Sequence, residues 1–154
     1  MGNILITGAT GYIGGRLVRA LEQDGRQLRC MARRPEILKA RLAPHVEVVA
    51  GDVLLPDQLE AALADVDTAY YLVHSLGLGA SFEAVEAEGA ANFAAAARNA
   101  GVKKIIYLGG LGDAETRSPH MRSRHHVGEP VARVRRAHHR IPRFRHHRLR
   151  KPFL

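Results

Sequence analysis

Three glycines at intervals of three residues, Gly8, Gly11 and Gly14, constrain the fold of this chain more than any other feature of its sequence. A short apolar segment, residues 3–7, precedes them, and apolar residues recur at helical spacing after them. The glycines therefore join a predicted strand to a predicted helix. Glycine permits a tight turn close to a phosphate, and a helix N-terminus offers free N–H groups and a partial positive charge. This arrangement predicts a site for the pyrophosphate of a dinucleotide.

Predicted strands and helices alternate from the N-terminus to about residue 108. Apolar runs predict strands at residues 3–7, 27–32, 46–50, 68–73 and 103–108. Helical spacing, with proline at several starts and glycine at several ends, predicts helices at about residues 13–24, 35–43, 56–64 and 82–100. The alternation predicts an α/β fold, a Rossmann-type doubly wound parallel sheet with strand order 3-2-1-4-5.

The end of the second predicted strand bears on the choice of cofactor. Proteins that bind NAD place an acidic residue there, about 20 residues beyond the glycines, to bind the ribose 2′-hydroxyl. Here the strand runs into Arg33 and Arg34, with no acid. Guanidinium groups suit the 2′-phosphate of NADP, because they form charge-assisted hydrogen bonds with phosphate. We expect NADP(H), and NAD(H) remains the alternative if the two arginines are only solvated residues at a helix start.

Four segments carry a family resemblance. Residues 7–15 resemble the cofactor loop of the extended and atypical short-chain dehydrogenases/reductases, a group that includes sugar epimerases and NmrA-like NAD(P)-binding proteins. Gly51-Asp52-Val53, residues 70–74 and residues 100–108 resemble the third, fourth and fifth strand regions of that family. The resemblance covers about residues 2–129 and implies an NAD(P)-binding, oxidoreductase-like protein with a small-molecule substrate that the sequence does not identify.

The resemblance also implies positions for the cofactor. It implies that Asp52 and Val53 contact the adenine, and that Val73 and His74 lie beside the nicotinamide ribose. The residues implied at the cofactor loop are Gly8, Thr10, Gly11, Tyr12, Ile13 and Gly14.

The catalytic residues of the family are missing from the sequence. Family enzymes use a Ser after the fifth strand and a Tyr-x-x-x-Lys pair, in which Tyr exchanges a proton with the substrate. Gly109 and Gly110 stand where the Ser is expected, and His120 and Arg124 stand in place of Tyr and Lys. We therefore name no catalytic residue. A non-catalytic dinucleotide sensor or assembly factor is the alternative to an oxidoreductase, and hydride transfer would separate the two.

Charge divides the chain into two unequal parts. Residues 1–116 hold 11 Lys and Arg against 14 Asp and Glu, whereas residues 117–154 hold 12 Lys and Arg against the single acid Glu129. We expect an incomplete NAD(P)-binding domain at residues 1–129 and a basic, irregular, disordered tail at residues 130–154. Such a tail allows a third function, non-specific polyanion binding with a steep salt dependence. Phe144 is the only aromatic residue in the tail before its last residues, so specific nucleic-acid recognition by base stacking is not expected.

We expect that the basic tail arises from a shifted reading frame. The composition changes abruptly after Val127-Gly128-Glu129. Read one base later, a permitted set of codons for residues 131–153 can encode a segment like LRxSGVPxTEFRAxxIIGSGS, which resembles the continuation of related proteins. The rival interpretation is an evolved basic interaction tail. If the shift is real, the sheet lacks its sixth strand and the chain is a truncated, inactive fragment with an exposed sheet edge.

Composition bears on location and on metals. No apolar run approaches the roughly 20 residues of a membrane span, and the N-terminus lacks the pattern of a signal peptide. The single cysteine, Cys30, lies in an apolar segment and is expected to be buried filler rather than a reactive thiol. We expect a cytoplasmic protein that does not bind membranes. The histidine pairs of the tail are adjacent residues that do not share a helix face, so no metal site is expected.

Overall fold

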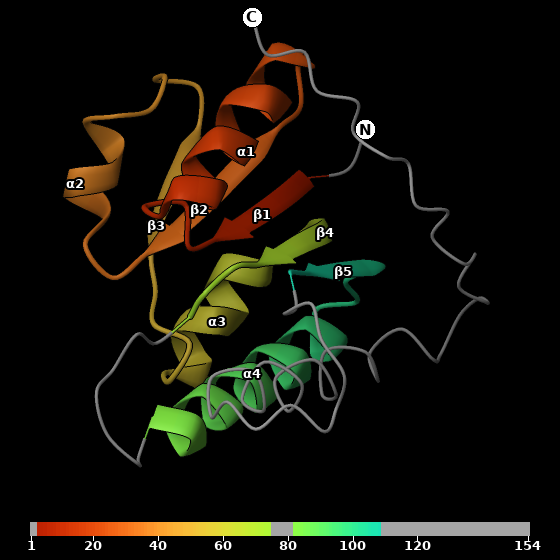
Figure 1. Cartoon of the computed structure of the whole chain (residues 1–154). Helices are drawn as coiled ribbons and strands as arrows, with labels where there is room; N and C mark the ends of the chain where they lie inside the picture. The colour runs from red at the N-terminus through yellow and green to blue at the C-terminus, as the bar shows by residue number, and fades with distance from the viewer. Residues whose placement is uncertain (1–2, 75–81, 109–154) are drawn as a thin grey trace, which may run out of the picture.

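Strands and helices alternate without exception in the computed structural model, which describes residues 3–74 and 82–108 (Figure 1). The elements in chain order are β1 (Asn3–Thr7), α1 (Tyr12–Gln23), β2 (Leu28–Ala32), α2 (Pro35–Lys39), β3 (Glu47–Ala50), α3 (Pro56–Leu63), β4 (Val66–Tyr71), α4 (Phe82–Asn99) and β5 (Lys104–Tyr107).

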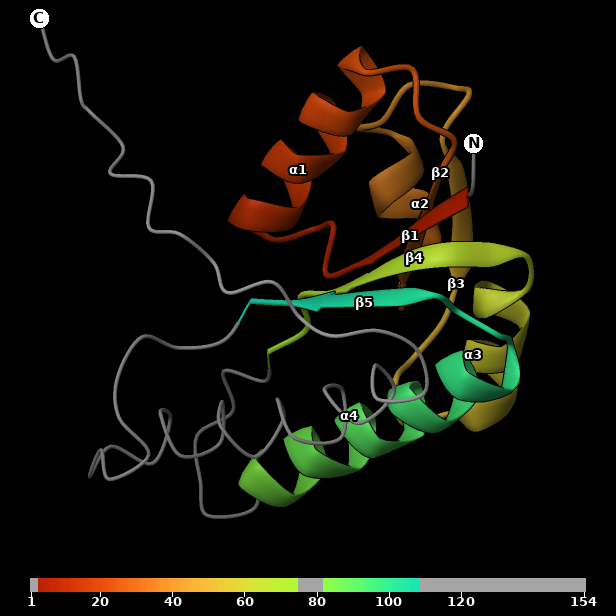
Figure 2. The ribbon, with the colours of Figure 1, turned by 90° about the vertical axis from the view of Figure 1, so that its right-hand side faces the viewer.

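The strands form one parallel sheet in the order β3-β2-β1-β4-β5, which confirms the predicted α/β fold and strand order. Strand β1 lies at the centre and pairs with β2 on one side and β4 on the other. Helices α1 and α2 cover one face of the sheet, and α3 and α4 cover the other (Figure 2). Such burial on both faces explains why β1 is a continuous apolar run.

The sheet separates two hydrophobic cores. Because successive side chains of a strand point to opposite faces, Leu5 joins the core beneath α3 and α4, whereas Ile4 and Ile6 join the core beneath α1 and α2. The rings of Tyr71 and Phe93 pack in the first core with their centroids 4.8 Å apart. The five-strand unit therefore has the two-sided apolar packing that a doubly wound fold requires.

Glycine ends α1 and α4 as predicted. Gly25 and Gly101 both have a positive φ, +66° and +73°. After α1, Gly25 N–H donates to Glu22 O at 3.0 Å and Arg26 N–H donates to Leu21 O at 3.3 Å. These two hydrogen bonds satisfy carbonyl groups that would otherwise be left over at the helix end.

Three element boundaries differ by two residues or more from the sequence-based expectation, and one of them is the start of β4, which lies at Val66 rather than Thr68. Helix α2 ends at Lys39 rather than near Ala43, because the chain tightens there into a turn in which Arg41 N–H donates to Leu38 O, three residues back, at 3.0 Å. Strand β4 ends at Tyr71 rather than Val73, because β1 turns away at its end. There the Thr7 hydroxyl donates to Tyr70 O at 3.0 Å and accepts from Leu72 N–H at 3.1 Å, so a side chain takes the place of the missing strand partner.

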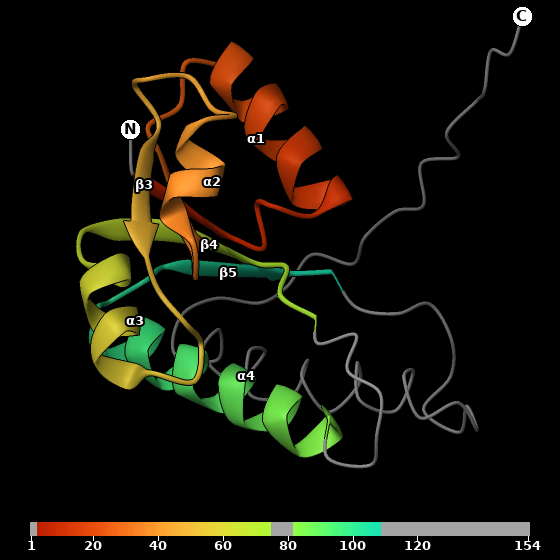
Figure 3. The ribbon, with the colours of Figure 1, turned by 90° about the vertical axis from the view of Figure 1, so that its left-hand side faces the viewer.

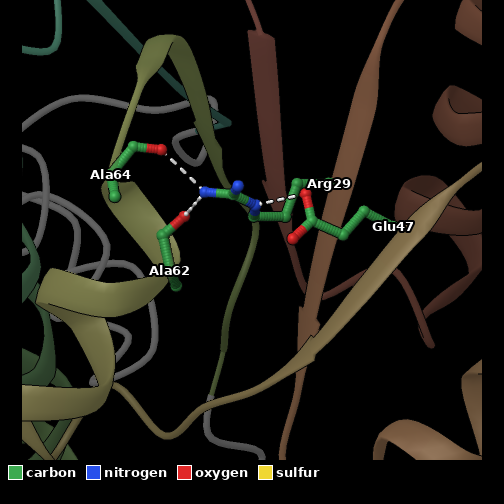
Figure 4. Close-up of polar contacts among 4 residues, drawn as sticks. All are labelled: Arg29, Glu47, Ala62 and Ala64. Atoms are coloured by element: carbon green, nitrogen blue, oxygen red, sulfur yellow. Dashed lines mark hydrogen bonds and ion pairs between the residues drawn. The ribbon is translucent and has the colours of Figure 1, made fainter.

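Arg29 links β2 to the end of α3 beneath the sheet (Figure 4). Its Nη1 donates to Ala62 O at 2.9 Å and Ala64 O at 2.7 Å, and its Nε donates to the Glu47 carboxylate at 2.7 Å. A helix C-terminus carries carbonyl groups without helical partners and a partial negative charge, and a cation satisfies both. Arg29 thus fixes the C-terminal end of α3 to β2 and, through Glu47, to β3.

Arg29→Ala is expected to lower the free energy of unfolding by about 2 kcal/mol, because it removes charge-assisted hydrogen bonds from a side chain that is only 15% exposed. Glu47→Ala is the matched control. Its carboxylate is 53% exposed, so the loss should stay below about 1 kcal/mol. Urea unfolding measures both variants. Equal losses would show that the Glu47 ion pair, rather than the capping of α3, is what Arg29 contributes.

Candidate functional site

The turn between β1 and α1 is packed so closely that glycine is required at two of its three positions. Gly8 has φ +70°, and a Cβ atom there would lie 2.6 Å from Leu72 O. A Cβ atom on Gly14 would lie 2.3 Å from Gly8 O, because the first turn of α1 rests on the glycine turn. Both distances are below any real Cβ contact. Because these two glycines have no side chain, the glycine turn can approach both the first turn of α1 and the residue after β4, Leu72, this closely.

Gly11 has a different role. It is exposed, its φ of −80° suits any residue, and a Cβ atom there would meet only Gly8 O, at 3.3 Å. A side chain here would therefore need only a shift of a few tenths of an ångström in Gly8 O, a much smaller demand than at Gly8 or Gly14. Its small size leaves the approach to the start of α1 open, as the close passage of a ligand would require.

The N-terminus of α1 has no compensating group among the described residues. Gly11 is its N-cap residue, no side chain caps the helix, and no acid lies in the first turn. Helix geometry leaves the N–H groups of Tyr12, Ile13 and Gly14 without a partner inside the helix. The first turns of α2, α3 and α4 each contain an acid, respectively Glu36, Asp57 and Glu83. The start of α1 is therefore the one that suits an anion from outside the chain.

The other predicted cofactor residues lie at the same edge of the sheet, where the carboxyl ends of the strands meet. Arg33 and Arg34 directly follow β2 and are exposed. Asp52 and Val53 follow β3, and Val73 and His74 follow β4, all half-buried. This edge includes the point between β1 and β4 where the strand order reverses, the usual ligand site of an open α/β sheet.

Contacts from α3 and α4 hold the loop after β3 in place. Asp52 N–H donates to Gln58 Oε1 at 3.0 Å, and Asn92 Nδ2 donates to Val53 O at 3.3 Å. A Cβ atom on Gly89 would lie 2.7 Å from Val53 Cγ2, so the loop rests directly on α4. Sequence reasoning missed Asn92 and Gly89 in this role, since their partner lies almost 40 residues away and no spacing connects them.

Helices α1 and α2 lie side by side on one face of the sheet (Figure 3). A groove of about 270 Å³ is lined by residues of α1, of α2 and its C-terminal end, and of the glycine turn. Three arginines line it, Arg16, Arg19 and Arg41, and sequence reasoning missed all three. Its other lining residues are Ala9, Thr10, Gly11, Tyr12, Gly15, Leu38 and Leu42. Helical spacing could have placed Arg16 and Arg19 on the same face of α1 as Tyr12. It could not have placed Arg41, which tertiary packing brings to them.

Two buried titratable side chains are excluded from acid–base chemistry near neutral pH. Burial, with a smaller effect of the Glu22 carboxylate, raises the pKa of Cys30 to about 12, and the thiol is fully buried. This confirms the buried-filler interpretation of Cys30. Burial, with the nearby Glu86 and Tyr107, also raises the pKa of Tyr71 far above its usual range. Tyr71 is thus a neutral packing residue.

Several sequence expectations lie outside the described residues. These are Gly109 and Gly110, the pair His120 and Arg124, and the tail at residues 130–154. Within residues 3–74 and 82–108, no cluster of His, Cys, Asp and Glu could hold a metal ion. Over the same ranges, no helix is long and apolar enough to cross a membrane.

Comparisons with known proteins agree with this geometry. The family described as NAD(P)H-binding matches residues 8–145. A 3β-hydroxysteroid dehydrogenase/Δ5→4-isomerase of Mycobacterium tuberculosis is 32% identical over 117 residues, which cover 70% of this chain and 31% of that protein. A ceramide reductase of Caulobacter vibrioides is 37% identical over 110 residues, which cover 68% of this chain and 34% of that one.

A solved structure is similar as well. The triphenylmethane reductase of Citrobacter sp., complexed with NADP(H), superimposes with a TM-score of 0.74 at 30% identity over 86% of this chain and 46% of that chain. This chain thus spans about a third of the length of the curated relatives named above and less than half of that structure. The match to the solved structure covers most of this chain. With the family match over residues 8–145, these features show that the chain belongs to the NAD(P)H-binding family, with homologues among the atypical short-chain dehydrogenases/reductases.

Proposed function

We propose that this chain is an oxidoreductase-like protein that binds NADP(H) in preference to NAD(H). The observation that carries the dinucleotide site is the start of α1, whose first turn has no capping side chain and no acid. A pyrophosphate supplies the negative charge and the hydrogen-bond acceptors that this turn lacks. Gly11 leaves room for the phosphates, and Gly8 and Gly14 fix the backbone that receives them.

The remaining cofactor contacts are proposed residue by residue. Thr10, Tyr12 and Ile13 border the pyrophosphate at the glycine turn, and Tyr12 and Ile13 are exposed there. Asp52 and Val53 receive the adenine on a loop that Asn92 and Gln58 hold from beneath. At the other end of the cofactor, Val73 and His74 would lie beside the nicotinamide ribose. Bound NADP(H) would supply the hydride, and these residues would orient the cofactor that carries it.

Arg33 and Arg34 are the proposed determinants of the NADP(H) preference. They follow β2, where an NAD-binding protein places its acid, and the structure leaves both side chains exposed to a ligand. Neither forms an ion pair within the part of the chain that the structure describes. A planar guanidinium matches a phosphate with two parallel hydrogen bonds, which a ribose hydroxyl cannot accept.

Whether hydride transfer occurs separates this function from that of a non-catalytic dinucleotide sensor or assembly factor. The sequence lacks the family's Ser and its Tyr-x-x-x-Lys pair, and this lack favours binding without turnover.

We further propose that residues 1–129 are the NAD(P)-binding domain and that residues 130–154 arise from a shifted reading frame. The nucleotide sequence of the gene tests the shifted frame. We also propose that the chain is cytoplasmic. Its tail would bind polyanions only non-specifically.

Gly11→Val is expected to weaken NADPH binding by at least about a hundredfold, because its side chain would block several charge-assisted hydrogen bonds to the pyrophosphate. Stability should change by less than about 1 kcal/mol, since the site is exposed and its backbone suits any residue. Calorimetric titration and urea unfolding measure the two effects. Gly14→Ala, by contrast, should destabilise the fold. If Gly11→Val keeps its affinity for NADPH, the glycine turn only connects β1 to α1 and does not bind the pyrophosphate.

Combined replacement of Arg33 and Arg34 by Ala is expected to weaken NADPH binding about tenfold or more, through lost charge-assisted contacts. NADH binding should stay within about threefold, because NADH has no 2′-phosphate. Fluorescence titration of both cofactors measures the preference. Arg26→Ala combined with Arg98→Ala removes the same charge elsewhere and should leave the preference intact. Equal affinity of the unaltered chain for NADH and NADPH would refute the proposal.

No hydride transfer is expected from residues 1–154 alone, because the proton relay of the family is missing. Absorbance of NADPH at fixed enzyme concentration, followed with a panel of carbonyl and quinone substrates, measures this. Steady oxidation of NADPH that disappears in Gly11→Val would overturn the expectation and establish a catalyst in place of a sensor.

A further inference from the structure

We propose that His74 determines which redox form of the dinucleotide the site prefers, because its imidazolium form disfavours the positively charged nicotinamide of NADP⁺ and its neutral form admits it. The nicotinamide ring of NADPH carries no charge, so the same ionisation acts on it far less. The inference rests on the proposed function, which puts His74 beside the nicotinamide ribose. It adds to that function a means of telling the two redox forms apart, which a dinucleotide sensor needs.

His74 is the outermost of four side-chain rings that pack in a row, here called the aromatic row and made of Phe93, Tyr71, Tyr107 and His74. The ring centres lie 4.8 Å apart for Phe93 and Tyr71, 6.2 Å for Tyr71 and Tyr107, and 6.1 Å for Tyr107 and His74. Tyr71 and Tyr107 are register partners on β4 and β5. The imidazole meets Tyr107 edge to face, at 61°, so it is held from behind at the carboxyl edge of the sheet.

The aromatic row passes from the core to the sheet edge. Phe93 and Tyr71 are 0% and 2% exposed, whereas Tyr107 and His74 are half-buried. Charges at a half-buried position are screened less than charges in open solvent. A proton gained by His74 therefore acts more strongly on a ring beside it than one gained at the open surface.

Few other ionisable groups are near this position. In the sequence, no charged side chain other than His74 lies between Asp67 and Glu83. Of the groups packed along the aromatic row, Tyr107 and Tyr71 are phenols, and burial with the nearby Glu86 and Tyr107 raises the pKa of Tyr71 far above its usual range. Glu86, on α4, is the buried carboxylate next to Tyr71. An imidazole is the side chain that ordinarily changes charge between pH 5 and 8.

The test measures the dissociation constants of the full chain for NADP⁺ and NADPH by calorimetry, at about pH 8 and about pH 6 and about 0.15 M ionic strength. The quantity compared is the constant for NADP⁺ divided by that for NADPH. The 2′-phosphate also titrates near pH 6, but it does so in both forms and cancels from this ratio. NAD⁺ and NADH, which lack that phosphate, provide a second ratio.

His74→Asn and His74→Gln remove the ionisation and keep a polar side chain, while Glu86 and every other histidine remain. His45→Asn is the matched control. His45 is exposed and precedes β3, so it lies toward the opposite edge of the parallel sheet. Far-UV circular dichroism at both pH values verifies that each variant is folded.

The ratio is expected to rise about fivefold from pH 8 to pH 6 in the full chain and in His45→Asn, and to stay constant in both His74 variants. A ratio that does not change with pH in the full chain overturns the inference, as does a rise that persists in the His74 variants. In both of these cases the proposed function stands, since the dinucleotide still binds. If neither redox form binds at either pH, the proposed function fails and the inference fails with it.

Discussion

The contact between Gly8 and Leu72, the residue after β4, determines how β1, β4 and the start of α1 are placed at the edge of the sheet. A Cβ atom on Gly8 would lie 2.6 Å from Leu72 O, and one on Gly14 would lie 2.3 Å from Gly8 O. Three backbone segments therefore meet with no side chain between them. Where β1 and β4 part, the Thr7 hydroxyl replaces the lost strand pairing by bonding to Tyr70 O and Leu72 N–H. The opening at the sheet edge is set by this backbone contact, and the start of α1 faces it.

Much of this arrangement could be predicted from the sequence, because it depends on local patterns. The alternation of apolar runs with helical spacing predicted the strand order. The predicted ends of α1 and α4 coincide with Gly25 and Gly101, whose φ is positive. The residues that sequence reasoning missed act across the fold. Asn92 supports Val53, and Arg41 joins two arginines of α1, through packing between elements that no spacing relates. The end of β4 was misplaced because its partner β1 turns away, which β4 itself does not encode.

The relatives named above act on different compounds, a steroid, a ceramide and a triphenylmethane dye, by their descriptions. This chain spans only a third to a half of their lengths. A shared fold alone therefore does not identify the compound on which this chain acts.

Each helix follows a strand of the parallel sheet along the chain, so all four helix N-termini lie toward the same edge. A helix N-terminus carries about half a positive elementary charge. In α2, α3 and α4 an acid of the first turn offsets this charge, and only α1, among the described helices, leaves it uncovered. The partial positive charge at this edge is therefore concentrated at the start of α1, and added salt screens its attraction for an anion in solution.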